Sequence, residues 1–248
     1  MNFDFSNVKI PKKIDSPISK AVIQIQYESD CTAAILHNFL CKLKEQLISL
    51  DLAEKIEDQP VLMIPEEQRE KDVDLKKLPY YSISTSNGQY SFAIGPSAMF
   101  FIVNSKYDGW KQWSSFFTPI LEIVQKENLV KKIISVGDSC FDDIHFDDVA
   151  IMEHLNCNIS ILGERMLSGF SFTTHVSTDE CDGDFIIHSK DKNSLQISIA
   201  CGMKKEFEVA EFFEKKNDIL LIPHTMNKKI FFSLLNKDFV DSHFNPQW

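Results

Sequence analysis

The chain has 248 residues, of which 44% are hydrophobic and 25% are charged, and its formal net charge is −10. This composition is typical of a folded, soluble globular protein and excludes a disordered one. A chain of this length forms one large domain or two domains of about 120 residues each. Sequence-specific DNA binding is not expected, because the chain is acidic and has only two arginines, Arg69 and Arg165, for bidentate contacts with guanine and phosphate.

The sequence shows neither a membrane-targeting segment nor a recognisable cysteine motif. No apolar run approaches the roughly 18 to 20 residues that span a bilayer, and residues 1–11 lack the apolar segment of a secretory signal. We therefore expect a cytoplasmic protein that contacts no membrane. The cysteines show neither Cys-x-x-Cys nor zinc-finger spacing, so the sequence predicts reduced thiols and no cofactor. They are Cys31, Cys41, Cys140, Cys157, Cys181 and Cys201.

The first half of the chain predicts a strand, a helix, a strand meander, a second helix and a further strand. Asn87-Gly88 separates two strands of the meander and predicts a type I′ hairpin turn. The charge-rich segment 54–77 reads as a solvated excursion. The predicted strands are residues 20–28, 80–85, 89–94, 98–104 and 130–136, and the predicted helices are residues 32–50 and 108–127, with Pro119 bending the second.

The second half predicts four more strands and a C-terminal amphipathic helix over 219–235, which Pro223 starts or kinks. His224, beside that proline, reads as a surface or capping residue. Asp182-Gly183 reads as a turn between the second and third of these strands. The strands are residues 156–162, 169–176, 185–189 and 195–201.

The order of these elements predicts an α+β fold, in which long amphipathic helices pack on antiparallel sheets. We expect two sub-domains joined near residues 140–150. The first is an N-terminal α+β sub-domain over 1–145, and the second is a β-rich sub-domain over 146–248 that ends in a helix.

Three stretches carry a family resemblance: SPISKAVIQIQYE from Ser16, the region from Tyr80 to Ile144 with its Tyr107-x-x-Trp110 arrangement, and NDILLIPHTMNKKIFFSLLNKD from Asn217. Together they resemble a sporadically distributed family of prokaryotic proteins of unassigned function. Residues 133–139 (IISVGDS) depart from the Gly-Leu-Arg-Tyr-Ile-Asn-like strand of that family, and residues 197–203 lack its acidic residues. The resemblance implies an accessory-gene setting, such as a mobile element or an antiphage defence module, and it supplies no reaction to transfer.

Charge is concentrated in one window. Between Asp138 and Asp191 there are twelve acidic residues and two basic ones, so this window accounts for the whole formal net charge of −10. An acidic surface attracts a basic partner and accelerates the encounter. We therefore favour a non-enzymatic interaction or regulatory component of an accessory complex that binds a basic protein partner. The residues predicted to bind it are Asp179, Glu180, Asp182 and Asp184.

Two alternatives stay open. In an extended chain, Asp143, His145 and Asp147 share one face and could ligate a divalent metal, as in a metal-dependent hydrolase or nuclease. The competing interpretation of the same residues is a solvated turn that leaves a strand. A metal site generally recruits ligands from a second element as well, and the nearest plausible donors are Asp138, Glu153, His154 and His188.

The other alternative is a small-molecule sensor with a Phe-lined cavity between sheet and helix, suggested by the twenty phenylalanines. Phosphate-loop, dinucleotide-binding and nucleophile-elbow motifs are absent from the sequence, so no catalytic residue is assigned. Homo-oligomerisation is left open.

Overall fold

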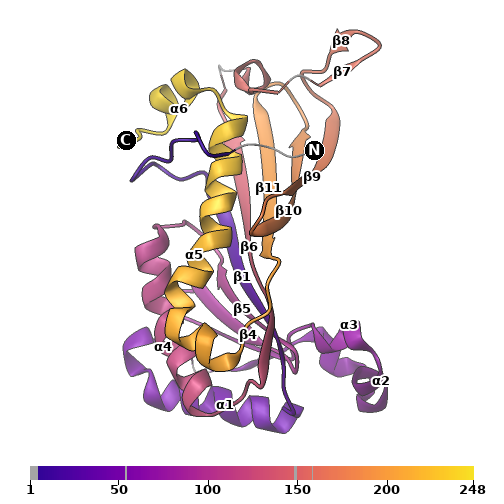
Figure 1. Cartoon of the computed structure of the whole chain (residues 1–248), viewed down its shortest axis with the longest axis vertical. Helices are drawn as coiled ribbons and strands as arrows, with labels where there is room; N and C mark the ends of the chain where they lie inside the picture. The colour runs from indigo at the N-terminus through magenta and orange to yellow at the C-terminus, as the bar shows by residue number, and fades with distance from the viewer. Residues whose placement is uncertain (1–4, 54, 148–149, 158) are drawn as a thin grey trace. The chain divides into compact units, whose positions relative to one another are not determined.

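A computed structural model describes residues 5–53, 55–147, 150–157 and 159–248 of the chain. The α+β prediction is confirmed: the described part holds one large sheet and several helices (Figure 1). Nine described strands are hydrogen-bonded in the order β2-β3-β4-β5-β1-β6-β11-β10-β9, and two short strands, β7 and β8, pair separately. The strand pairs β2–β3, β3–β4, β4–β5, β9–β10 and β10–β11 are antiparallel.

The chain forms two compact units, and each is built from more than one segment. Unit 1 comprises residues 1–21, 138–204 and 221–248, and unit 2 comprises residues 22–137 and 205–220. The single boundary predicted between residues 145 and 146 stays a prediction.

Unit 2 contains the strand meander and the central helix of the sequence prediction. Its strands are β2 (Glu57–Asp58), β3 (Tyr81–Ser84), β4 (Tyr90–Ile94) and β5 (Ala98–Val103), with parts of β1 (Ile18–Glu28) and β6 (Lys132–His145). Its helices are α1 (Ala33–Gln46), α2 (Glu66–Lys71), α3 (Val73–Lys76) and α4 (Trp110–Lys126), with 3-10 turns at Ile48–Leu50 and Pro60–Met63. The segment 54–77, predicted to be an excursion, thus carries short helices in its described part.

Helix α4 buries the stripe that its apolar spacing predicts. Trp113 and Phe117 are fully buried, and Phe116 stacks on Tyr90 of β4 at a centroid distance of 5.1 Å. Phe117 lies 5.7 Å from the ring of Phe101 in β5. The helix therefore packs on β4 and β5, and Pro119 is accommodated inside it.

The predicted hairpin between β3 and β4 exists, but its predicted turn type is wrong. A type I′ turn needs a positive φ at both central residues, whereas φ is positive at Gly88 (71°) and not at Asn87. The Gly88 amide donates to the carbonyl of Thr85 (2.8 Å), and the Asn87 side chain accepts from the Gln89 amide (3.0 Å). These local bonds form a longer loop in which only the glycine adopts the left-handed conformation.

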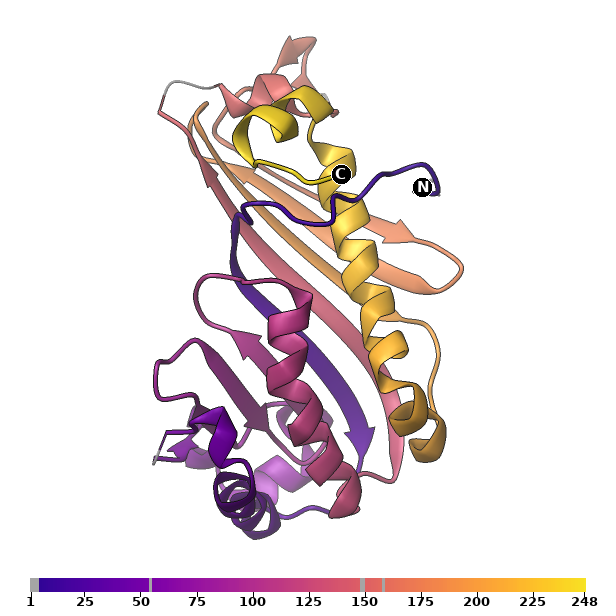
Figure 2. The ribbon, with the colours of Figure 1, turned by 90° about the vertical axis from the view of Figure 1, so that its left-hand side faces the viewer.

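Unit 1 holds the remaining strands and the C-terminal helices. Its strands are β7 (Ser160–Ile161), β8 (Glu164–Arg165), β9 (Phe170–Ser177), β10 (Cys181–Ser189) and β11 (Ser194–Met203), with the second part of β6. A 3-10 turn covers Ile151–His154, and the helices are the C-terminal part of α5 (Val209–Leu234) and α6 (Lys237–His243). Figure 2 shows this part of α5 lying along the strands of unit 1. The core between them includes Ile187, Ile197, Ile230 and Phe239.

The predicted turn at Asp182-Gly183 is wrong. Both residues lie inside β10, and the chain turns before it, where the Thr178 hydroxyl accepts from the Cys181 amide (3.1 Å). Gly183 serves the close approach of β11 instead, because a Cβ there would lie 2.5 Å from the carbonyl oxygen of Ala200. A glycine inside a strand often marks such a close approach of another backbone.

The C-terminal helix begins earlier than predicted. It runs from Val209 to Leu234, with non-helical dihedral angles at Lys215, so Pro223 lies in its interior instead of at its start.

Candidate functional site

The strands of unit 1 present one buried face and one exposed face. Along β10, burial alternates strictly: Cys181, Gly183, Phe185, Ile187 and Ser189 are buried, and the residues between them are exposed. The exposed set, which we call the open face, combines acidic, imidazole and apolar side chains. It comprises Phe141, Asp143 and His145 of β6, Gln196 and Ala200 of β11, Asp182, Asp184, Ile186 and His188 of β10, and Ser171, Thr173 and His175 of β9.

The four predicted partner-binding residues lie together at one end of the open face. Asp179 and Glu180 are exposed in the turn before β10, and Asp182 and Asp184 follow on the exposed side of that strand. We call these four residues the acidic patch. The structure therefore brings the predicted residues together, while their binding role stays a prediction.

Two nitrogen-bearing side chains, those of His175 and Lys204, lie within the acidic patch. The His175 imidazole is 3.1 Å from a carboxylate oxygen of Asp184 and 3.8 Å from one of Asp182, and the Lys204 ammonium is 3.2 Å from Asp182. A hydrogen bond from Ser177, followed by the contact with Lys204, holds the pKa of Asp182 below its usual value. Because all these side chains are at least one-third exposed, such pairs contribute little to stability.

The predicted metal residues occupy the other end of the open face. Strand β6 continues to His145, so this segment is extended, and Asp143 and His145 share its exposed side as expected. Asp143 accepts a hydrogen bond from Gln196 (2.9 Å), and His145 contacts Asp147 (3.0 Å), which follows the strand. Metal binding by Asp143, His145 and Asp147 stays a prediction. Asp148, in the same acidic run, lies outside the described residues.

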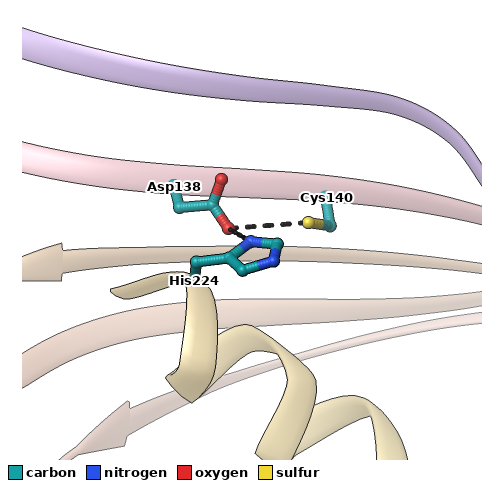
Figure 3. A group of neighbouring side chains, drawn as sticks. All are labelled: Asp138, Cys140 and His224. Atoms are coloured by element: carbon teal, nitrogen blue, oxygen red, sulfur yellow. Dashed lines mark hydrogen bonds and ion pairs between the residues drawn. The ribbon is translucent and has the colours of Figure 1, made fainter. Parts of the chain in front are cut away.

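The opposite side of β6 carries a second, buried constellation. Asp138, Cys140 and Asp142 point inward at alternate positions, where hydrophobic side chains are the rule. Helix α5 contributes His224 and Asn227, one turn apart on its inner face, and both are buried. Figure 3 shows the side chains of Asp138, Cys140 and His224 converging.

The Asp138 carboxylate is the centre of this buried constellation. Its Oδ2 atom lies 3.0 Å from His224 Nδ1, 2.8 Å from Asn227 Nδ2 and 3.6 Å from Cys140 Sγ. Asn227 Nδ2 also donates to the main-chain carbonyl of Asp138 at 2.9 Å. Oδ1 of Asp138 and Oδ1 of Asn227 are buried and have no hydrogen-bond partner among the described residues.

Burial perturbs the neighbouring titratable groups. Burial raises the pKa of the Cys140 thiol well above its usual value, and the nearby carboxylates add to the effect. The pKa of Asp142 is raised to about 8, first by burial and then by the charges of Asp143 and Asp138. The pKa of Lys228 on α5 is lowered by burial. Perturbed groups of this kind are concentrated at functional sites, although structural networks produce them too.

Sequence reasoning missed this constellation. The prediction that His224 is a surface or capping residue is wrong, because the residue is fully buried. Two signals were present: Asp138, Cys140 and Asp142 share one face of an extended chain, and His224 and Asn227 share the helical stripe of Leu220 and Phe231.

Unit 2 contains a cavity of about 630 Å³ beside the N-terminus of α1. Its lining includes Tyr27 and Tyr80 but no phenylalanine, so it differs from the predicted Phe-lined cavity. Buried Arg69 places its guanidinium 4.8 Å from the centre of the Tyr80 ring. Acidic residues and Lys131 line the cavity as well, which gives it no single charge preference.

Comparison with models of protein families, with curated protein sequences and with solved structures finds no match for this chain. No helix in the described ranges combines the length and the apolar composition that crossing a bilayer requires.

Proposed function

We propose that the protein is a non-enzymatic interaction component that binds a basic segment of a partner protein on the open face of unit 1. The observation that supports this proposal is the juxtaposition of the acidic patch with exposed apolar side chains on one sheet face. Ile186 of β10 is 39% exposed and Phe141 of β6 is 38% exposed, and both belong to the open face. Protein interfaces combine apolar contacts with complementary charge in this way.

The charge balance of the face favours a basic partner. The open face and the acidic patch together hold five carboxylates, and the Lys204 ammonium is paired with one of them, Asp182. The carboxylates belong to Asp143, Asp179, Glu180, Asp182 and Asp184. A basic segment would gain contacts with the acids and with Ile186, whereas an acidic partner would be repelled. The antiphage-defence or mobile-element setting rests on the family resemblance alone and stays a prediction.

Affinity purification from the native host tests the proposal. The face variant changes Asp179, Asp182 and Asp184 to Asn and Glu180 to Gln. A control variant removes the same charge from exposed positions of unit 2: Glu45→Gln, Glu122→Gln, Glu214→Gln and Asp218→Asn.

The proposal expects a protein that is captured by the wild type and by the control variant but not by the face variant. Capture that is equal in all three samples would contradict it, since the open face would then not be the binding surface. Circular dichroism of both variants establishes that each is folded.

A further inference from the structure

The buried constellation in unit 1 has the donor set of a transition-metal site. Asp138, Cys140 and His224 each offer one ligand atom, and these three atoms lie within 4.8 Å of one another. All three residues are buried. Carboxylate oxygen, thiolate sulfur and imidazole nitrogen are the ligands that zinc takes in proteins.

The distances between the donor atoms agree with tetrahedral coordination. With usual zinc bond lengths of about 2.0 Å to oxygen and nitrogen and about 2.3 Å to sulfur, tetrahedral angles place oxygen about 3.3 Å from nitrogen and about 3.5 Å from sulfur. The corresponding separations from Asp138 Oδ2 are 3.0 Å to His224 Nδ1 and 3.6 Å to Cys140 Sγ. Both separations are thus within a few tenths of an ångström of the tetrahedral values.

The unpartnered oxygens are a second, independent observation. Asp138 Oδ1 and Asn227 Oδ1 are buried without a hydrogen-bond partner among the described residues, whereas three donors crowd around Asp138 Oδ2. A buried polar atom without a partner has lost its hydration and gained no bond in exchange, which is unfavourable. Such an arrangement is expected where a cation supplies the missing interaction.

We propose that Asp138, Cys140 and His224 form a binding site for one divalent transition-metal ion, with zinc as the preferred metal. The carboxylate and the thiolate would neutralise the two charges of the ion, so the buried site carries no net charge. Magnesium and calcium are disfavoured, because they prefer all-oxygen sites. Asn227 holds the carboxylate by donating to Asp138 Oδ2 (2.8 Å), as outer partners of metal ligands do, and its own Oδ1 is a candidate fourth donor.

The role that this placement supports is structural. His224 lies 86 residues from Asp138 in sequence, and a metal ion between them would tie helix α5 to strand β6 within unit 1. A site whose protein ligands are all buried binds its metal ion during folding, and the free energy of metal binding then adds to the free energy of unfolding. This inference does not depend on the proposed partner-binding function, since the open face lies on the other side of β6.

The test uses the untagged full-length chain expressed in zinc-containing medium. Elemental analysis should find about one zinc per chain, as for a single site of this kind. X-ray absorption at the zinc edge should show one sulfur among nitrogen and oxygen ligands. Removal of the metal with a chelator under reducing conditions should lower the thermal midpoint.

Cobalt substitution then identifies the thiolate. The metal-free wild type should develop the near-ultraviolet thiolate-to-cobalt charge-transfer band on addition of Co²⁺, and Cys140→Ser should abolish it. Cys201→Ser is the matched control, because Cys201 is also a buried cysteine of unit 1 but is not among the three ligands. It should retain the band.

Two results would overturn the proposal. One is wild-type protein that contains no metal and gives no cobalt band, which would leave the constellation a hydrogen-bonded network. The other is an absorption spectrum without sulfur, or a cobalt band that persists in Cys140→Ser. The absorption measurement needs no variant, so the proposal stays testable even if Cys140→Ser fails to fold.

Discussion

Replacement of Phe117 by Ala tests how unit 2 holds its central helix. Phe117 is fully buried, and its ring lies 5.4 Å from Trp110, 6.0 Å from Trp113 and 5.7 Å from Phe101. Truncating a buried phenylalanine costs roughly 3 to 5 kcal/mol through lost burial and the cavity left behind. The edge-to-face contacts with the two tryptophans place the expected loss in the upper part of that range.

The assay is denaturant unfolding followed by tryptophan fluorescence. Two of the three tryptophans contact Phe117, and the third, Trp248, lies in unit 1. For a chain of this size, roughly 3 to 5 kcal/mol corresponds to a fall of about 6 to 20 °C in the thermal midpoint. Glu122→Ala, on the exposed side of the same helix, should change stability by less than about 0.5 kcal/mol. An unchanged unfolding midpoint in Phe117→Ala would refute the packing described for α4.

Three further predictions concern unit 1. Gly183→Ala should lower the free energy of unfolding, measured by chemical denaturation, by about 1 to 3 kcal/mol, because the new Cβ would lie 2.5 Å from a carbonyl oxygen of β11. Ser198→Ala is the control. A loss in Gly183→Ala no larger than the loss in Ser198→Ala would contradict the close approach of the two strands. In metal-free protein, Asp142 binds its proton more tightly when folded, so its contribution to stability is present below its usual pKa of 3.8 and is lost as the pH rises to about 8. Asp142→Asn should therefore flatten the decline of unfolding free energy between these pH values, and an unchanged decline would show that this carboxyl is not the cause. Asn227→Ala should weaken Co²⁺ binding by about 10- to 100-fold in a spectroscopic titration, and unchanged affinity would remove Asn227 from the site.

The sequence predicts the elements whose apolar residues follow a local period. The stripe of α4 is an example: Trp113, Phe117 and Val124 repeat at helical spacing, and all three are buried. The pairing of β3 with β4 is another, since the strands flank a short loop that contains Asn87-Gly88. In these cases the information lies within a few residues of chain.

The features that sequence reasoning missed depend on contacts between distant segments. Gly183 resembles a turn residue until β11 is placed beside it, with Ala200 opposite Asp184 in the register. His224 resembles a surface residue because its partner Asp138 is 86 residues away. The second half of β6 was missed for a related reason: its buried positions include polar residues, whose burial is stabilised by α5 and not by the strand itself.

The acidic patch was predicted because the local density of charged residues can be counted directly along the sequence. The acids of this window that lie in β6 and β10 occupy, however, both sides of the sheet. Asp138 and Asp142 are buried, whereas Asp182 and Asp184 are exposed. Composition does not distinguish these two environments, which require opposite physical interpretations.

The most direct test of partner binding through the open face is the association rate of the purified partner, measured by stopped flow at several ionic strengths. The partner is the protein captured by the wild type and lost from the face variant. The account predicts that the rate for the wild type falls steeply as salt is added, because the acidic patch attracts a basic segment over a Debye length of about 8 to 10 Å. The face variant should associate more slowly and with a flatter salt dependence, while the control variant should behave as the wild type does. Equal rates and equal salt dependence for the wild type and the face variant would contradict the account.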